Sequence, residues 1–145
     1  MMAKFRIRRV DATNPRVWAQ LVLMDSLCFG HDAPPLTDNS GVWWIASHDG
    51  APAGYAAIKP SMSNPEDGGY MHRAGVLSEF RGNGLQKTLI KRRLSYAKSQ
   101  GWDWVVTDTN NNPASGNSLI SCGFKMFSPS NPWSFVSANY WRKYL

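Results

Sequence analysis

The stretch Gly75-Val76-Leu77-Ser78-Glu79-Phe80-Arg81-Gly82-Asn83-Gly84-Leu85 decides how this chain is interpreted. An apolar β run ends near Leu77, a short loop carries two glycines, and a basic amphipathic segment begins at Leu85. Glycines allow backbone N–H groups to approach a phosphate closely, and the first turn of a helix adds unpaired N–H donors and the positive end of its dipole. The stretch therefore predicts an anion site between a strand and a helix. The loop fits neither GxxxxGK[ST] nor GxGxxG, which disfavours a nucleoside triphosphatase and a dinucleotide-binding fold.

Strands and helices alternate outward from this stretch in both directions. Hydrophobic periodicity and turn residues predict the following elements: strand 5–10, helix 15–27 capped by Asn14, a hairpin of strands 42–47 and 52–59, strand 70–77, helix 85–99, strand 104–107, a short helix from 113 to 122, and strands 124–127 and 138–144. This order predicts an α/β fold with a mixed central β-sheet flanked by helices. The length of 145 residues suits one domain, 1–145.

Composition excludes several classes of protein. With 43% hydrophobic and 18% charged residues, the chain is typical of a folded domain rather than a disordered one. No apolar stretch approaches the roughly 18–20 residues of a membrane span, so we expect no membrane insertion and a cytoplasmic location. Cys28 and Cys122 form no CxxC motif, which suits a reducing compartment and leaves a disulfide between them open. His31 and His48 have no partners at metal-ligand spacing, so no metal site is predicted.

The net charge of +6 indicates a nucleic acid, an acidic membrane surface or a phosphate-bearing cofactor as partner. Six basic residues and no acidic one lie between residues 81 and 98, and the rest of the chain is balanced. A charge confined to the anion loop and the helix after it favours the cofactor, and some of these side chains are expected to form the solvated face of that helix. The six are Arg81, Lys87, Lys91, Arg92, Arg93 and Lys98.

Three segments resemble the GCN5-related N-acetyltransferases (GNAT family). Arg81-Gly82-Asn83-Gly84-Leu85-Gln86 is similar to the family's [Q/R]-x-x-G-x-[G/A], with Gln86 departing at the last position. The preceding residues 76–80 resemble V-x-P-E-[YF], with Ser78 in place of Pro. Residues 112–124 resemble N-x-x-A-x-x-x-Y-x-x-x-G-F, with Leu119 at the Tyr position. The resemblance spans essentially the whole chain and is densest between Tyr70 and Phe124.

This resemblance implies an acetyltransferase-like fold and an acetyl-CoA-dependent enzyme that transfers an acetyl group to a primary amine by direct attack. In the family, the loop amides hold the pyrophosphate of acetyl-CoA, and the strand before the loop binds the pantetheine arm. Carried over to this chain, the cofactor-binding residues are Ala74, Gly75, Val76, Arg81, Gly82, Asn83, Gly84, Leu85, Gln86, Lys87 and Asn112.

The resemblance also supplies catalytic candidates. The arylalkylamine acetyltransferases place two histidines at the positions of Tyr70 and His72, and imidazole titrates near neutral pH, so His72 is the leading base. Strand alternation predicts that Tyr70, His72 and Ala74 share one face. The alternative for His72 is simple packing within the sheet. Asp108 is the other candidate base, although a turn-capping carboxylate is the favoured interpretation of it. The N–H of Val76 is the candidate for polarising the thioester carbonyl.

The leaving thiolate and the acceptor are less well defined. Since Leu119 replaces the usual Tyr, the proton donor is left open among Ser118, Tyr140, Tyr144 and water, and loss of catalysis is a further option. Trp133, Trp141, Asp32 and Asp38 are candidates to face the acceptor, with core packing or solvation as the plainer alternatives.

A second class of function is a catalytically degenerate acetyltransferase fold that binds CoA or nucleic acid, because basic surfaces with aromatic residues bind single strands. No nucleic-acid motif supports a nucleic-acid partner. The amine acceptor and the oligomeric state, with a dimer as one option, are left open by the sequence.

Overall fold

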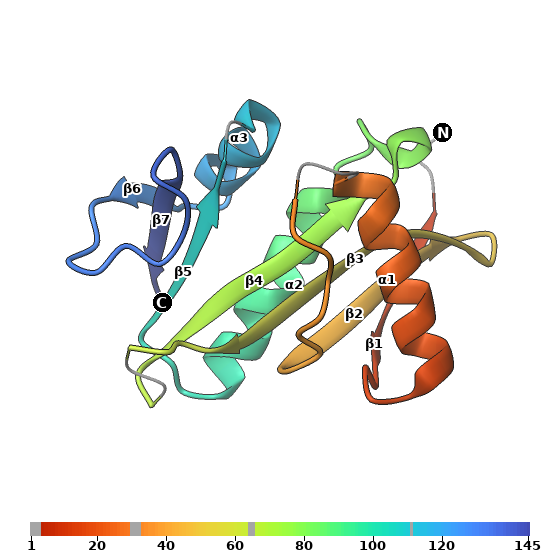
Figure 1. The fold of residues 1–145 in the computed structure, drawn as a ribbon, viewed down its shortest axis with the longest axis horizontal. Coiled ribbons are helices and arrows are strands. Elements are labelled where there is room, and N and C mark those ends of the chain that lie inside the picture. The colour runs from red at the N-terminus through yellow and green to blue at the C-terminus, as the bar shows by residue number, and fades with distance from the viewer. Residues whose placement is uncertain (1–3, 30–32, 64–65, 111) are drawn as a thin grey trace.

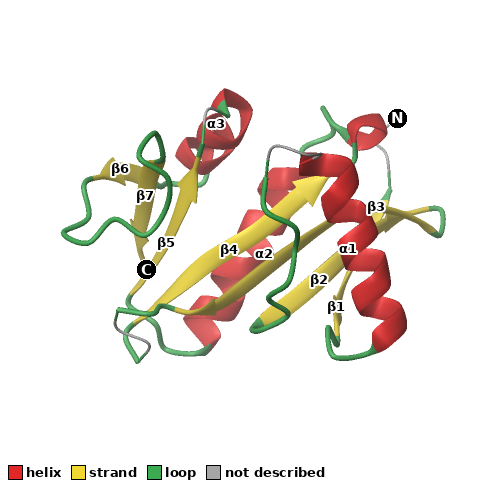
Figure 2. Ribbon diagram, in the orientation of Figure 1, coloured by secondary structure: helices red, strands yellow, loops and turns green. Residues whose placement is uncertain are grey.

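The computed structural model describes residues 4–29, 33–63, 66–110 and 112–145. They form a seven-stranded mixed sheet of order β1-β2-β3-β4-β5-β7-β6 with helices on both faces (Figures 1 and 2). The elements in chain order are β1 (Phe5–Val10), α1 (Pro15–Phe29), β2 (Val42–His48), β3 (Ala51–Pro60), β4 (Gly68–Val76), a single 3-10 turn (Ser78–Phe80), α2 (Leu85–Ser99), β5 (Trp104–Thr109), α3 (Pro113–Ser121), β6 (Lys125–Phe127) and β7 (Asn139–Tyr144). The predicted α/β architecture is confirmed, and the expected elements differ at their ends by only a residue or two.

Local chemistry explains where two of the helices begin. The side chain of Asn14 accepts hydrogen bonds from the N–H groups of Arg16 and Val17 at 3.0 and 3.3 Å, which caps α1. Asn112 accepts from the N–H of Ser115 at 3.1 Å and caps α3, and a proline follows the cap residue in both helices. Helix α2 begins differently, because its N-cap is Gly84 and no side chain in the described part of the chain caps it.

The sheet divides the core into two layers. Helix α1 packs on one face, where Leu21 and Met24 lie against Trp43 and Tyr55. Helices α2 and α3 cover the other face with a larger apolar cluster. Strand β3 is buried on both sides from Ala53 to Ile58, which explains why its sequence is apolar without alternation.

Strands β4 and β5 are the one parallel pair within the described sheet, and they separate part of the way along (Figure 1). The two strands pair only where Gly68–Tyr70 of β4 lies beside Trp104–Val106 of β5. Just beyond it, the hydroxyl of Thr107 donates to the carbonyl of Met71 at 2.8 Å. The second halves of both strands are therefore free to line a site.

A β-bulge in β4 changes which side chains face which helix. Ala57 of β3 lies opposite Arg73, whereas Lys59 lies opposite Tyr70, so β4 contains one extra residue across this interval. The expectation that Tyr70, His72 and Ala74 share one face is therefore wrong. His72 packs against Trp43 on the α1 side, but Ala74 packs with the cluster on the α2 side.

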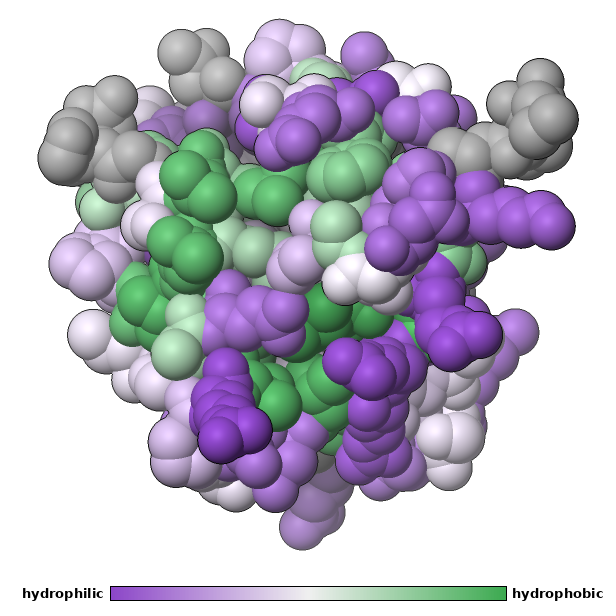
Figure 3. Space-filling model, turned by 90° about the vertical axis from the view of Figure 1, so that its right-hand side faces the viewer, coloured by the Kyte–Doolittle hydropathy of each residue, from purple (hydrophilic) through white to green (hydrophobic). Residues whose placement is uncertain are grey.

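The surface at the β1 edge is mixed in character. Figure 3 looks onto this edge, where hydrophilic side chains surround smaller apolar areas. The described helices include none that is long and apolar enough to cross a membrane. Cys28 and Cys122 are both free thiols. His31 and Asp32 lie outside the described residues.

Candidate active site

A cleft of about 610 Å³ lies where the end of β4, the glycine loop and the starts of α2 and α3 meet. Every predicted cofactor-binding residue except Asn83 lines it. Asn83 instead supports the loop from behind, since its side-chain amide donates to the carbonyls of Phe80 and Arg81 at 3.0 and 3.4 Å. The sequence did not indicate Cys28, Phe29, Phe80, Ala114 and Ser115, which also line the cleft, as does Ser118, one of the candidate proton donors. Asn112, Ser115 and Ser118 follow one another at intervals of three residues. This helical spacing indicates that they share one face of the helix.

The glycine loop presents unpaired backbone donors to this cleft. Gly82 and Gly84 have φ of 82° and 75°, a left-handed conformation that glycine adopts without steric cost. The N–H groups of residues 82–87 have no hydrogen-bond acceptor among the described groups. Lys87 and Arg81 are exposed at the same place and line the cleft. Unpaired N–H donors and nearby basic side chains at a helix N-terminus are features that suit an anion.

The departure from the family pattern at Gln86 has a structural explanation. Its side-chain amide donates to the hydroxyl of Ser115 at 2.9 Å, which links α2 to α3. The side chain is thus turned toward α3, while its backbone N–H remains part of the loop.

The free edge of β4 offers further backbone groups. The N–H of Leu77 donates to the carbonyl of Ala53 at 2.9 Å, and Val76 lies opposite Gly54. In an antiparallel ladder this makes Val76–Gly54 a non-hydrogen-bonded pair, so the N–H and C=O of Val76 point away from β3 toward the cleft. The guanidinium of Arg81 already donates to that carbonyl at 3.1 Å. The backbone N–H and C=O groups of Ala74, two residues earlier, point in the same direction as those of Val76. The backbone groups of Gly75 face β3 instead.

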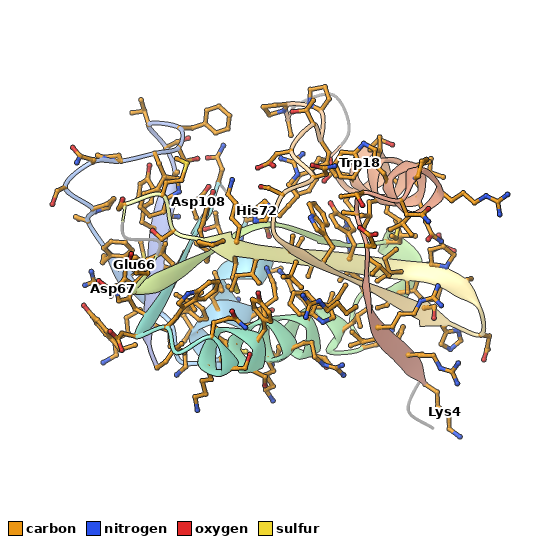
Figure 4. All side chains as sticks on the ribbon, turned by 90° about the horizontal axis from the view of Figure 1, so that it is seen from below. Lys4, Trp18, Glu66, Asp67, His72 and Asp108 are labelled. Carbon is orange, nitrogen blue, oxygen red and sulfur yellow. The ribbon has the colours of Figure 1, made fainter. Side chains whose placement is uncertain are left out.

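A second cavity of about 360 Å³ continues from this cleft between the separated halves of β4 and β5. The two share Phe29, Ala74, Gln86, Asn112 and Ser115. His72, Asp108 and Arg93 also line the second cavity. Figure 4 shows His72 and Asp108 on the α1 side of the sheet, opposite α2.

His72 is held as a neutral imidazole. Burial, reinforced by the positive charge of Lys59, lowers the pKa of His72 to about 4. Its Nδ1 lies 3.4 Å from the carbonyl oxygen of Tyr70, and its Nε2 is buried with no hydrogen-bond partner among the described residues. A proton on Nδ1 therefore leaves Nε2 as a bare acceptor at the cavity.

Asp108 does not cap a turn, which was the favoured expectation. It lies within β5, and its Oδ1 accepts hydrogen bonds from the hydroxyl of Tyr70 at 2.6 Å and from the indole N–H of Trp133 at 2.9 Å. Tyr70 is committed to this contact and does not line the cavity. Burial and the Asp108 carboxylate raise the pKa of Tyr70 well above its usual range. Tyr70 and Trp133 thus orient a carboxylate whose other oxygen can meet a ligand.

A buried ion pair anchors the rim of the second cavity. Arg73 donates to both carboxylate oxygens of Asp25 at 2.8 Å each, and Tyr55 donates to the same group. Arg73 also donates to the carbonyl of Pro34 at 2.9 Å, which ties down the segment after α1. Asp38 is neutralised by Lys59 at 2.8 Å, so it is not free to attract an amine.

No tyrosine hydroxyl lines either cavity within the described part of the chain. Leu119 is only 4% exposed and lines the second cavity, as its sequence position implies. Tyr140 is buried and accepts from the N–H of Ser134, and Tyr144 borders a different pocket. Ser118 does line the cleft beside the glycine loop.

Comparison with protein families agrees with this geometry. The family model described as "Acetyltransferase (GNAT) family" matches residues 9–124. N-acetyltransferase family 8 member 2 of Rattus norvegicus is 33% identical over 81 residues, which are 54% of this chain and 36% of the relative. N-acetyltransferase 8B of Homo sapiens is 31% identical over 94 residues, which are 62% of this chain and 41% of the relative. The chain thus matches about two-fifths of the length of these curated relatives.

Solved structures agree in fold. An acetyltransferase from Streptococcus agalactiae superposes with a TM-score of 0.76 at 18% identity, covering 97% of this chain and 98% of that one. An acetyltransferase from Salmonella typhimurium, solved with its cofactor acetyl-CoA, superposes with a TM-score of 0.74 at 15% identity, covering 98% and 94%. At such identities the likeness concerns the fold alone.

Proposed function

The chain belongs to the GNAT acetyltransferase family, and we propose that it transfers an acetyl group from acetyl-CoA to a primary amine by direct attack. One observation carries this proposal. An uncapped helix start with free N–H groups opens into a cleft that continues into a cavity between separated strands. The first part suits a phosphate-bearing cofactor, and the second has room for a thioester beside an acceptor.

The residues of the cleft fit acetyl-CoA. The free N–H groups of residues 82–87 would hold the pyrophosphate, with Arg81 and Lys87 beside it. The N–H and C=O groups of Ala74 and Val76 that point away from β3 would form hydrogen bonds with the pantetheine arm, as they would with a neighbouring strand. When bound, acetyl-CoA supplies an activated acyl thioester at the mouth of the second cavity.

The second cavity supplies groups for an amine. The oriented carboxylate of Asp108 would attract an ammonium group, and the bare Nε2 of His72 would take up a proton, directly or through water. The N–H of Val76 remains the candidate donor to the thioester carbonyl. Because Leu119 replaces the usual tyrosine, protonation of the thiolate falls to Ser118 or water.

Titration calorimetry with acetyl-CoA, followed by mass spectrometry of a panel of amines, tests this function. We expect saturable binding of acetyl-CoA and an acetylated product with at least one amine. Absence of any binding would refute the proposal. Binding of CoA without transfer to any amine would instead support the degenerate, CoA-binding alternative, for which the buried Leu119 is the supporting observation.

A further inference from the structure

Arg93 is a buried cation on α2 with no acidic partner among the described residues. It is one of the six basic residues between 81 and 98, but it is only 3% exposed and does not belong to the solvated face of the helix. Its Nε donates to the carbonyl of Leu89 at 3.2 Å, and its Nη1 donates to the carbonyl of Ala57 at 3.4 Å. The ion pairs among the described residues do not include it, and its Nη2 has no hydrogen-bond partner among them.

The position of Arg93 follows from the register of the sheet. Ala57, whose carbonyl it binds, lies opposite Arg73, the residue directly before Ala74. On α2, Arg93 comes two turns after Gln86, about 10 Å along the helix axis, and both line the second cavity. The guanidinium therefore lies just beyond the point that a pantetheine arm along Ala74 and Val76 would reach.

The two sides of this cavity differ in charge. His72 and Asp108 approach from the α1 side, together with the rim formed by Phe29 and Pro34. Arg93 approaches from α2, the helix that also contributes Gln86 to both cavities. A ligand group that meets Arg93 therefore arrives with the acyl donor rather than with the acceptor.

The buried guanidinium of Arg93 would be stabilised by an anion bound beside it. Removing a charge from water without a counter-charge is costly, and burial lowers the pKa of Arg93 to about 9. Both of its described hydrogen bonds go to neutral carbonyls, which offset this cost only in part. The unpaired end of a guanidinium suits a carboxylate, which it binds through two parallel hydrogen bonds.

We infer that Arg93 can receive a terminal carboxylate on the acyl group, so that the chain accepts short dicarboxylic acyl-CoA donors such as malonyl- or succinyl-CoA in addition to acetyl-CoA. This inference rests on the proposed function and widens its range of acyl donors. In the transfer, the amine nitrogen forms a bond to the thioester carbonyl carbon, and the C–S bond breaks. The amine loses one proton to the base, and the CoA thiolate gains one proton. The distal carboxylate stays on the acyl chain throughout and is not consumed.

Calorimetric titration of the full chain with acetyl-, butyryl-, malonyl- and succinyl-CoA tests this inference without knowledge of the acceptor. We expect succinyl-CoA to bind at least ten-fold more tightly than butyryl-CoA, which has the same number of acyl carbons but no carboxylate. Arg93→Met should abolish or reverse that preference. Arg92→Met removes the same charge from the exposed face of the same helix and should leave the preference intact.

The outcomes separate this inference from the proposed function. Equal affinity for succinyl- and butyryl-CoA, with acetyl-CoA still bound, overturns the inference and leaves the proposed function standing. Failure to bind any acyl-CoA refutes the proposed function itself. If Arg93→Met instead raises KM only for acceptors that carry a carboxylate, the carboxylate belongs to the acceptor and the inference is overturned. Should Arg93→Met not fold, Arg93→Gln keeps a donor for the Ala57 carbonyl, and the comparison of donors on the unaltered chain needs no variant.

Discussion

The buried, neutral His72 predicts a specific dependence of stability on pH. An unfolded chain exposes this histidine, whose pKa then lies near 6.5, whereas burial lowers the pKa of His72 to about 4 in the fold. Between these two values the unfolded chain binds more protons than the folded one. The free energy of unfolding therefore falls as the pH is lowered from 6.5 to 4, and no further contribution from His72 is lost below 4.

The size of the effect follows from the shift. A difference of about 2.5 units in pKa corresponds to about 3 kcal/mol, at about 1.4 kcal/mol for each unit. His72→Phe removes the titrating group and keeps an aromatic ring against Trp43, which lies 5.5 Å from the imidazole. The carboxylates titrate in both proteins, so the difference between them isolates His72. Relative to the variant, the unaltered chain should lose about 3 kcal/mol between pH 7 and pH 4.

Urea unfolding at pH 7, 6, 5 and 4 measures this difference, since stability is obtained from each midpoint and slope. His48→Phe, at a less buried histidine, serves as the matched control. A constant difference between the unaltered chain and His72→Phe from pH 7 to pH 4 would show that His72 is not a buried neutral group. The same shift has a kinetic consequence, because an acid limb of kcat/KM that belongs to His72 should lie near pH 4 rather than near 6.5.

Three further predictions concern the cofactor loop, the rim and the acceptor site. Gly84→Asp should raise the Kd for acetyl-CoA more than ten-fold, because its carboxylate would meet the pyrophosphate. Gly84→Ala is the matched control, because it introduces the same left-handed strain and its Cβ would also lie in open space. If calorimetry finds that both variants lose the same affinity for acetyl-CoA, the assignment of the loop to the pyrophosphate is contradicted. Asp25→Asn should cost about 3 kcal/mol in urea unfolding because it leaves the half-buried Arg73 without its counter-charge. Asp38→Asn breaks a more exposed pair and should cost less than about 1 kcal/mol, and similar costs would argue against the buried pair as an anchor. Asp108→Asn should lower kcat/KM for the amine at least ten-fold in steady-state assays while acetyl-CoA still binds, and unchanged kinetics would remove Asp108 from the acceptor site.

Most of the fold could be predicted because its determinants are local. Asn14 and Asn112 are followed by prolines, and both begin helices by capping N–H groups within three residues. The glycine loop was recognisable for the same reason, because its conformation depends on Gly82 and Gly84 themselves and its donors on the helix that follows.

Long-range packing limited the prediction of the site. Strict alternation along β4 predicts one shared face for Tyr70, His72 and Ala74, but the bulge opposite β3 moves Ala74 to the other face. Asp108 was expected to cap a turn, because no local pattern indicates that Tyr70 and Trp133 donate to it from elsewhere in the fold. The inward position of Arg93, in contrast, has a local cue in the sequence. Arg93 comes four residues after Leu89 and four before Ala97, which places a cation on the inward face of α2.

The sequence by itself determined the order of strands and helices, the glycine loop at residues 81–87 and the concentration of positive charge around it. These features depend on backbone conformation and side chains within a turn or two of each other. The tertiary structure alone decided that β4 and β5 separate, that His72 is buried as a neutral imidazole and that Arg93 has no acidic partner among the described residues. These features depend on strand register and on the loss of water around a group when distant segments pack. Neither the register nor the loss of water can be obtained from the spacing of residues along the chain.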